Sequence, residues 1–131
     1  MNFDDNFRRI GSANIEPVKA LIESLTEEEW NAESIRQQRY EVHKHTQTIG
    51  LVYDPDFRHT HPTRLPPLKM FDNALKPVLW MIADHFEQSP AGKALVTENG
   101  LGYFIRATLV RLQAGHGIAA HRDMNFSLTH S

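Results

Sequence analysis

Residues 111–123 read RLQAGHGIAAHRD, and this stretch decides the fold that the sequence predicts. It follows a mostly apolar run, Tyr103–Leu112, which favours a core strand. The glycines at 115 and 117 let the backbone turn sharply, and Ile118–Asp123 then predicts a second strand antiparallel to the first. The stretch therefore indicates a β-hairpin that ends in the triplet His121-Arg122-Asp123.

The triplet has the spacing of a metal site on an extended chain. In a strand, residues two positions apart point the same way, with Cα atoms about 6.5–7 Å apart. The His121 imidazole and the Asp123 carboxylate can then reach one ion, while Arg122 projects from the opposite face. The 2-His-1-carboxylate facial triad binds Fe(II) with such ligands and leaves positions open for co-substrate and O₂. A hydrogen-bonded surface pair is the alternative interpretation of an isolated triplet.

Working outward from the hairpin, three segments have the pattern of helices. Apolar residues recur on one helical face over Asn14–Leu25 and again over Phe71–Glu87, where Ser89-Pro90-Ala91-Gly92 predicts the end. Between them, Thr26 and Glu29 have the spacing of a capping box at the start of a short helix. Trp30 is the expected core anchor of that helix.

Upstream of the hairpin, the sequence predicts one more strand and a long loop. Polar and apolar residues alternate over Tyr40–Tyr53, which favours a strand that carries His43 and His45 on one face. We expect these two histidines to be half-buried polar residues, with a place on the substrate side. The alternative is a metal-binding pair, but no nearby carboxylate or turn supports it. The prolines of Asp54–Leu68 predict an irregular loop. Its histidines, His59 and His61, are expected to be solvated rather than metal ligands.

Composition excludes several classes of protein. The 131 residues are 40 % apolar, which predicts one domain over residues 1–131. No segment predicts a membrane span or a signal peptide, so the expected location is cytoplasmic. With no cysteine, any metal must be held by histidine and carboxylate. The net charge of −2 and the absence of a dense Lys/Arg run argue against a nucleic-acid partner.

The stretch 111–123 resembles the core of the aspartyl/asparaginyl β-hydroxylase family, which reads apolar strand, glycine turn, isoleucine or valine, then H-x-D or H-x-G. The resemblance loosely spans Tyr40 to the end and is specific over Tyr103–Asp123. It implies an Fe(II)/2-oxoglutarate-dependent dioxygenase, with His121 as the first iron ligand and Asp123 as the carboxylate ligand. Because the best-known animal members have glycine at the second position, Asp123 is more similar to free-amino-acid (proline) hydroxylases and to bacterial or phage relatives.

The same resemblance implies an α+β fold in which N-terminal helices pack on a double-stranded β-helix, a jelly-roll of the cupin type. In the family, a second histidine ligand and arginines that bind 2-oxoglutarate follow the H-x-D motif. Only Met124–Ser131 follow it here, so we expect a partial barrel that is incomplete at its C-terminal end. Exposed strand edges would then favour self-association.

Arg106 and Arg111 flank the expected core strand and are candidates for binding a 2-oxoglutarate carboxylate. Exposure at the rim of the barrel is the alternative for both. The resemblance implies hydroxylation by O₂ of Asp or Asn side chains in a peptide or protein, or of a free amino acid such as proline. Two other classes stay open: a non-catalytic remnant that acts as a binding or interaction module, and a non-redox cupin-like protein that holds Zn(II) or Mn(II).

Overall fold

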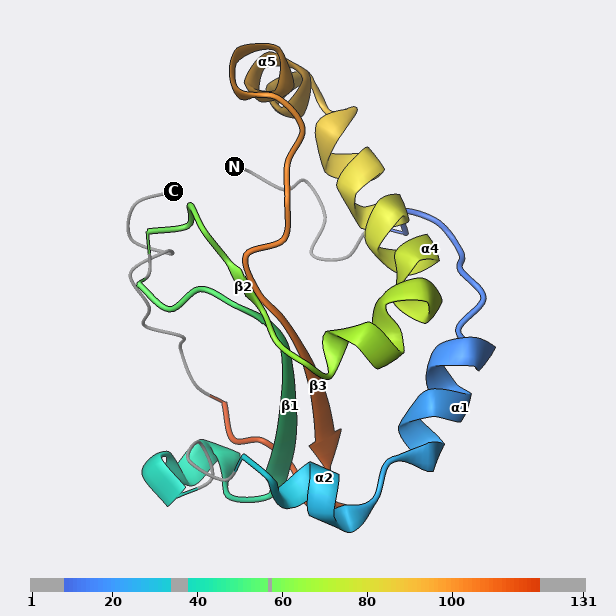
Figure 1. The fold of residues 1–131 in the computed structure, drawn as a ribbon, viewed down its shortest axis with the longest axis vertical. Coiled ribbons are helices and arrows are strands. Elements are labelled where there is room, and N and C mark those ends of the chain that lie inside the picture. Colours follow the sequence, from blue (N-terminus) through green and yellow to red (C-terminus); the bar gives the residue numbers. More distant parts are fainter. Residues whose placement is uncertain (1–8, 34–37, 57, 121–131) are drawn as a thin grey trace. The chain divides into compact units, whose positions relative to one another are not determined.

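The computed structural model describes residues 9–33, 38–56 and 58–120 (Figure 1). The described residues form an α+β structure with helices and one antiparallel sheet. Contacts divide the chain into two compact units. One combines the segment up to Ile22 with Phe71–Tyr103, and the other combines Glu23–Met70 with the segment from Phe104 onward.

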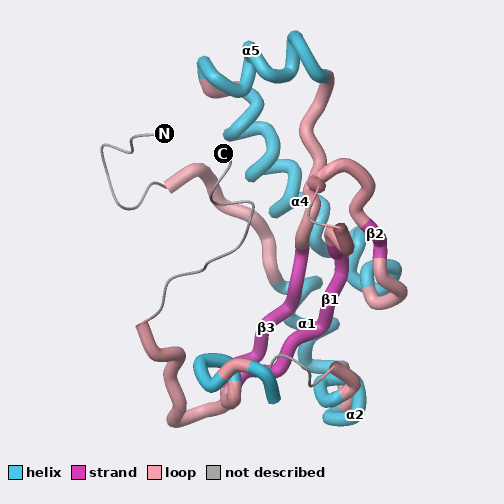
Figure 2. The backbone as a smooth tube through the Cα atoms, turned by 90° about the vertical axis from the view of Figure 1, so that its left-hand side faces the viewer, coloured by secondary structure: helices cyan, strands magenta, loops and turns pink. Residues whose placement is uncertain are grey.

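The second unit is built on a sheet of three strands. These are β1 (Thr46–Tyr53), β2 (Thr63–Arg64) and β3 (Ala107–Leu112), in the order β2-β1-β3 and all antiparallel (Figure 2). The β1–β3 register places Thr46 opposite Leu112 and Gln47 opposite Arg111, with an irregularity between Gly50 and Val52. Two segments that are about 60 residues apart in sequence thus lie side by side along most of their length.

The central strand β1 forms the core of this unit because its side chains are buried in succession. Leu51 and Ile49 are almost fully buried, at 1 % and 7 % exposure. Thr46, Gln47 and Thr48 are buried with them. A strand that is covered on both faces has consecutive buried side chains, and buried and exposed side chains do not alternate along it.

Helix α2 (Glu27–Asn31) begins where the sequence predicts, and the capping box is confirmed. The Glu29 backbone N–H donates to Thr26 Oγ1 at 3.2 Å, and the Thr26 backbone N–H donates to Glu29 Oε2 at 2.8 Å. These bonds satisfy backbone donors that an open helix start leaves free. Trp30 is the predicted anchor and is 2 % exposed, and α2 contacts β1.

The first unit is helical. Its main elements are α4 (Leu68–Glu87) and α5 (Pro90–Asn99), together with most of α1 (Glu16–Ser24). Phe71, near the start of α4, is fully buried. A side chain at Gly92 would place its Cβ 1.9 Å from the Phe86 carbonyl oxygen, so only glycine fits where α5 starts beside the end of α4.

Helix α5 was not predicted. The segment Ser89-Pro90-Ala91-Gly92 ends α4, as expected, but it also starts a new helix: Ser89 is the N-cap and its Oγ accepts the Gly92 N–H at 3.0 Å. Proline suits the first helical position because its missing N–H would have no helical partner there. The same residues therefore terminate one helix and begin the next.

The predicted strands are partly wrong at their ends. Residues 41–43 form a short 3₁₀ helix, η1 (Glu41–His43), so His43 is not on a strand and His45 lies one residue before β1. The strand predicted from Tyr103 begins at Ala107, and none of its side chains is buried, so it is not the core strand that was expected. Residues 118–120 are not a strand, and the rest of the predicted second strand lies outside the described residues.

The loop after β1 contains one piece of regular structure. Thr63 and Arg64 pair with Tyr53 and Val52 to make β2, and the Leu65 N–H donates to the Leu51 carbonyl oxygen at 2.9 Å. The short strand fits between Pro62 and Pro66, where backbone donors are intact. The jelly-roll barrel is not confirmed, since the strands of the described part of the chain make only this small sheet.

We expect Leu51→Ala to lower the free energy of unfolding by about 2–5 kcal/mol, because truncation removes buried contacts and leaves a cavity beside the central strand. Urea denaturation monitored by circular dichroism measures the change. Leu95→Ala is the matched control, because Leu95 is 59 % exposed on α5 and its truncation should cost far less. Equal losses for the two variants would contradict the placement of the core at β1.

Candidate functional site

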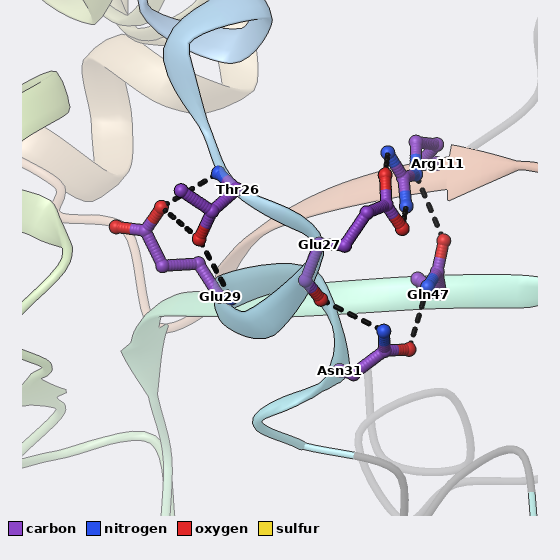
Figure 3. Close-up of polar contacts among 6 residues, drawn as sticks. All are labelled: Thr26, Glu27, Glu29, Asn31, Gln47 and Arg111. Carbon is purple, nitrogen blue, oxygen red and sulfur yellow. Dashed lines mark hydrogen bonds and ion pairs between the residues drawn. The ribbon is translucent and has the colours of Figure 1, made fainter.

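A hydrogen-bonded polar cluster joins α2 to the sheet (Figure 3). Its centre is Arg111 on β3, which faces Gln47 in the register of β1. The Arg111 Nε–H donates to Gln47 Oε1 at 2.8 Å. Because Gln47 is only 6 % exposed, this bond satisfies a buried amide oxygen and fixes the direction of the guanidinium.

The other edge of the guanidinium holds a carboxylate. Arg111 Nη1 and Nη2 donate to Glu27 Oε1 and Oε2 at 2.8 and 2.6 Å, a two-bond arrangement (Figure 3). The hydrogen bond from Arg111 lowers the pKa of Glu27, and the bond to Glu27 raises the pKa of Arg111. Paired charge-assisted bonds of this kind match the planar fork of arginine to the two oxygens of a carboxylate.

Asn31 closes the cluster into a ring of hydrogen bonds. Gln47 Nε2 donates to Asn31 Oδ1 at 2.7 Å, and Asn31 Nδ2 donates to the Glu27 carbonyl oxygen at 2.7 Å. The path from Arg111 through Gln47, Asn31 and Glu27 therefore returns to Arg111. Every polar side chain of the ring is oriented by its neighbours, which is the condition for a rigid network.

A buried aromatic ring supports the cation from one face. The Arg111 Cζ lies 4.7 Å from the centroid of Trp30, within the range of a cation–π contact. Trp30 is held in the core, whereas the Arg111 side chain is 33 % exposed. The guanidinium is therefore fixed on its inner side and open to solvent on part of its outer side.

Arg111 thus lies where a carboxylate can be bound, but the carboxylate it holds belongs to Glu27. Its predicted role toward 2-oxoglutarate stays a prediction and would require Glu27 to move away. Arg106, the second candidate, lies just before β3, and its Nε and Nη2 atoms are buried. Both arginines are partly exposed, so the structure does not decide between this role and a place at an exposed rim.

The loop between β1 and β2 contains a second polar pair. Asp54, directly after β1, is fully buried, and its Oδ2 lies 3.6 Å from His59 Nε2. His59 has a positive φ of 62°, an uncommon conformation for a residue with a side chain. It is therefore partly buried against a carboxylate and not simply solvated, whereas His61 is exposed as predicted.

A third cluster connects the glycine turn to the start of β1. The rings of His45 and His116 stack with centroids 3.7 Å apart and an angle of 19° between planes. His45 Nδ1 lies 3.4 Å from Gln113 Oε1, and the Gln113 N–H donates to the His45 carbonyl oxygen at 3.1 Å. Nitrogen lone pairs of nearly parallel rings do not converge, so this pair is not arranged to chelate one metal ion.

The predicted iron ligands His121 and Asp123 lie outside the described residues. Among the residues that the structure does describe, no group of three or more His, Cys, Asp or Glu side chains could hold a metal ion. The described helices also include none with the length and apolarity needed to cross a bilayer.

The sequence analysis missed the Glu27–Arg111 pair, the Asp54–His59 pair and the stack of His45 on His116. The first had a partial signal, because the capping box fixed the position of Glu27 at the start of α2. Pairing it with Arg111, 84 positions away, required the fold. Comparison with protein-family models, with curated proteins and with solved structures gives no match for this chain.

We expect Glu27→Gln to reduce stability at neutral pH, because it removes the charge that pairs with Arg111. The pKa of Glu27 in the folded protein is lowered from its ordinary value of 4.5. The stabilisation by ionised Glu27 is therefore fully present when the pH is above 4.5. That contribution is lost as the pH falls through the lowered value. The stability difference between the parent and Glu27→Gln should therefore shrink below about pH 4.5.

Thermal denaturation of both proteins from pH 7 to pH 3 measures this dependence. Glu28→Gln is the matched control: it removes the same charge from α2, but Glu28 forms no ion pair within the described part of the chain. A difference between the parent and Glu27→Gln that stays constant across the pH range would contradict the ion pair.

Proposed function

We propose that this chain carries iron ligands of an Fe(II)/2-oxoglutarate-dependent hydroxylase, namely His121 and Asp123. The observation that carries the proposal is the sequence constellation over residues 103–123, in which an apolar strand, a glycine turn and an H-x-D triplet follow in order. Imidazole nitrogen and carboxylate oxygen form a donor set that suits Fe(II).

Two features of the described residues support this interpretation. First, β3 lies within the strand predicted over Tyr103–Leu112 and pairs antiparallel with β1. Second, the chain turns where the glycines predict: the His116 N–H donates to the Gln113 carbonyl oxygen at 3.2 Å, and Gly115 has a φ of 78°. A residue with a side chain is disfavoured at such a φ, so the approach to the triplet depends on glycine.

With iron and 2-oxoglutarate bound, one atom of O₂ would enter the substrate as a hydroxyl group while 2-oxoglutarate became succinate and CO₂. The protein's own residues hold and orient the reactants. In the proposal, His121 and Asp123 fix the metal from one face of an extended segment, and Arg122 projects away from it. An arginine that offers two parallel N–H groups receives the co-substrate carboxylate, and Arg111 has that geometry toward Glu27.

The proposed substrates are those that the sequence analysis left open: Asp or Asn side chains of a peptide or protein, or a free amino acid such as proline. The loop after β1 is the candidate for selecting between them. It contains a fully buried carboxylate, Asp54, beside His59. The approach of Asp54 Oδ2 to His59 Nε2 at 3.6 Å brings the start of this loop close to its middle.

Anaerobic titration with Fe(II) and 2-oxoglutarate should produce the weak visible charge-transfer band of a bound chelate. Asp123→Ala should abolish the band because it removes the carboxylate ligand. Arg122→Ala should leave it nearly unchanged, because on an extended segment that side chain would project from the face opposite the two ligands.

The opposite outcomes point to the other classes. A folded protein that gives no band would favour a non-catalytic binding module. Zn(II) or Mn(II) retained after purification without chelator, again with no band, would favour a non-redox metal protein. Equal effects of the two substitutions would contradict the alternating placement of His121, Arg122 and Asp123.

A further inference from the structure

Glu27 is the most replaceable member of the hydrogen-bonded ring around Arg111. Its side chain is 72 % exposed, whereas Gln47 and Trp30 are 6 % and 2 % exposed. Within the described part of the chain, Arg111 is the partner recorded for its carboxylate oxygens. A solvent-exposed carboxylate can leave at little cost in desolvation, because water replaces its hydrogen bonds.

The guanidinium keeps its orientation when Glu27 is absent. Gln47 holds Nε at 2.8 Å, and the Trp30 ring supports the guanidinium face at 4.7 Å. Gln47 is itself held by Asn31 through a bond of 2.7 Å. None of these contacts involves the Glu27 carboxylate, so two outward N–H groups, on Nη1 and Nη2, would stay aimed at the same place.

We propose that Arg111 is a carboxylate-binding site of this protein, and that Glu27 is an internal occupant which a ligand carboxylate replaces. The exchange conserves charge and hydrogen bonds: one carboxylate leaves two N–H donors and another takes them. The Arg111 side chain is 33 % exposed and the Glu27 side chain on its fork is 72 % exposed, so departure of Glu27 opens the fork to solvent. Glu27 then acts as a gate that lowers the apparent affinity for the ligand.

The inference rests on the proposed function only for the choice of 2-oxoglutarate as the ligand that carries the carboxylate. The chemistry that recognises it is the general match of a guanidinium to a carboxylate. Acetate and succinate present the same group. Inorganic phosphate, which arginine also binds through two bonds, distinguishes a carboxylate site from a general oxyanion site.

The test is a metal-free NMR titration of the full chain with 2-oxoglutarate, followed at the Trp30 indole N–H. A Trp80→Phe background leaves Trp30 as the one tryptophan of the chain, and Trp80 is 68 % exposed, so its replacement disturbs little. Glu27→Gln should bind 2-oxoglutarate about fivefold more tightly or better, because the competing carboxylate is gone. Glu28→Gln, which removes an equal charge one residue away, should bind like the parent.

Two further arms identify the site and the ligand class. In the Glu27→Gln background, Arg111→Lys should lose most of the gained affinity, because a lysine keeps the charge but offers no planar fork. If this variant does not fold, the comparison of Glu27→Gln with Glu28→Gln still shows whether Glu27 competes with the ligand. Acetate and succinate should move the NMR signal of the Trp30 indole N–H in the same direction as 2-oxoglutarate does. Phosphate should bind more weakly than these carboxylates.

Equal affinities of the Glu27→Gln and Glu28→Gln proteins would overturn the proposal, as would unchanged binding by Arg111→Lys or binding of phosphate without carboxylates. No iron is added, so the result does not depend on His121 or Asp123. A positive titration without a charge-transfer band would preserve the carboxylate site and remove the iron proposal. A charge-transfer band together with equal affinities of the Glu27→Gln and Glu28→Gln proteins would preserve the iron proposal and remove the carboxylate site.

Discussion

The arrangement of α2 and the sheet depends on the fixed guanidinium of Arg111. A side chain that begins on β3 reaches across β1 to α2, so one cation joins three segments that are distant in sequence. The guanidinium is hydrogen-bonded to Gln47 on one side and to Glu27 on the other, and its face lies on the buried Trp30 ring. The network is satisfied as a ring, and such a ring favours one arrangement of its segments because a half-made ring leaves buried polar atoms without partners.

The parts of the fold that could be predicted from the sequence are those in which neighbouring residues determine the structure. The start of α2 follows from Thr26 and Glu29, which satisfy each other's backbone donors three positions apart. The long helix α4 could be predicted from apolar residues at helical spacing, and the helix continues past Pro77. By contrast, alternation over 40–45 resembled a strand, but residues 41–43 form 3₁₀ helix and the pairing with β3 begins only at Thr46. Alternation cannot show whether a neighbouring strand is present to pair with.

The polar sites were less predictable than the fold, for the same reason. Arg111 could be selected as an anion-binding candidate because it lies at the end of a predicted strand, yet its partner is 84 positions away. Asp54 directly follows a strand and precedes a proline, which suggests a turn, but its complete burial depends on the packing of the whole unit. Periodicity shows which residues share a face of one element, whereas a site forms between elements. The H-x-D triplet is the opposite case: its evidence is local to the sequence, and its residues lie outside the described part.

The double use of Arg111 links two properties that are usually treated separately. In the folded protein its guanidinium stabilises the attachment of α2 through Glu27, and in the proposed exchange the same atoms bind a ligand. Linkage then requires reciprocity: the bond between Glu27 and Arg111 weakens ligand binding, and bound ligand weakens that bond by the same coupling factor. Because Gln47, Asn31 and Trp30 remain in place in both states, the change would be confined to the Glu27 side chain and the first turn of α2. Trp30 and the bond between Asn31 and Gln47 keep α2 on the sheet, so occupancy at Arg111 would change the first turn of this helix, at the surface of the protein, without detaching it.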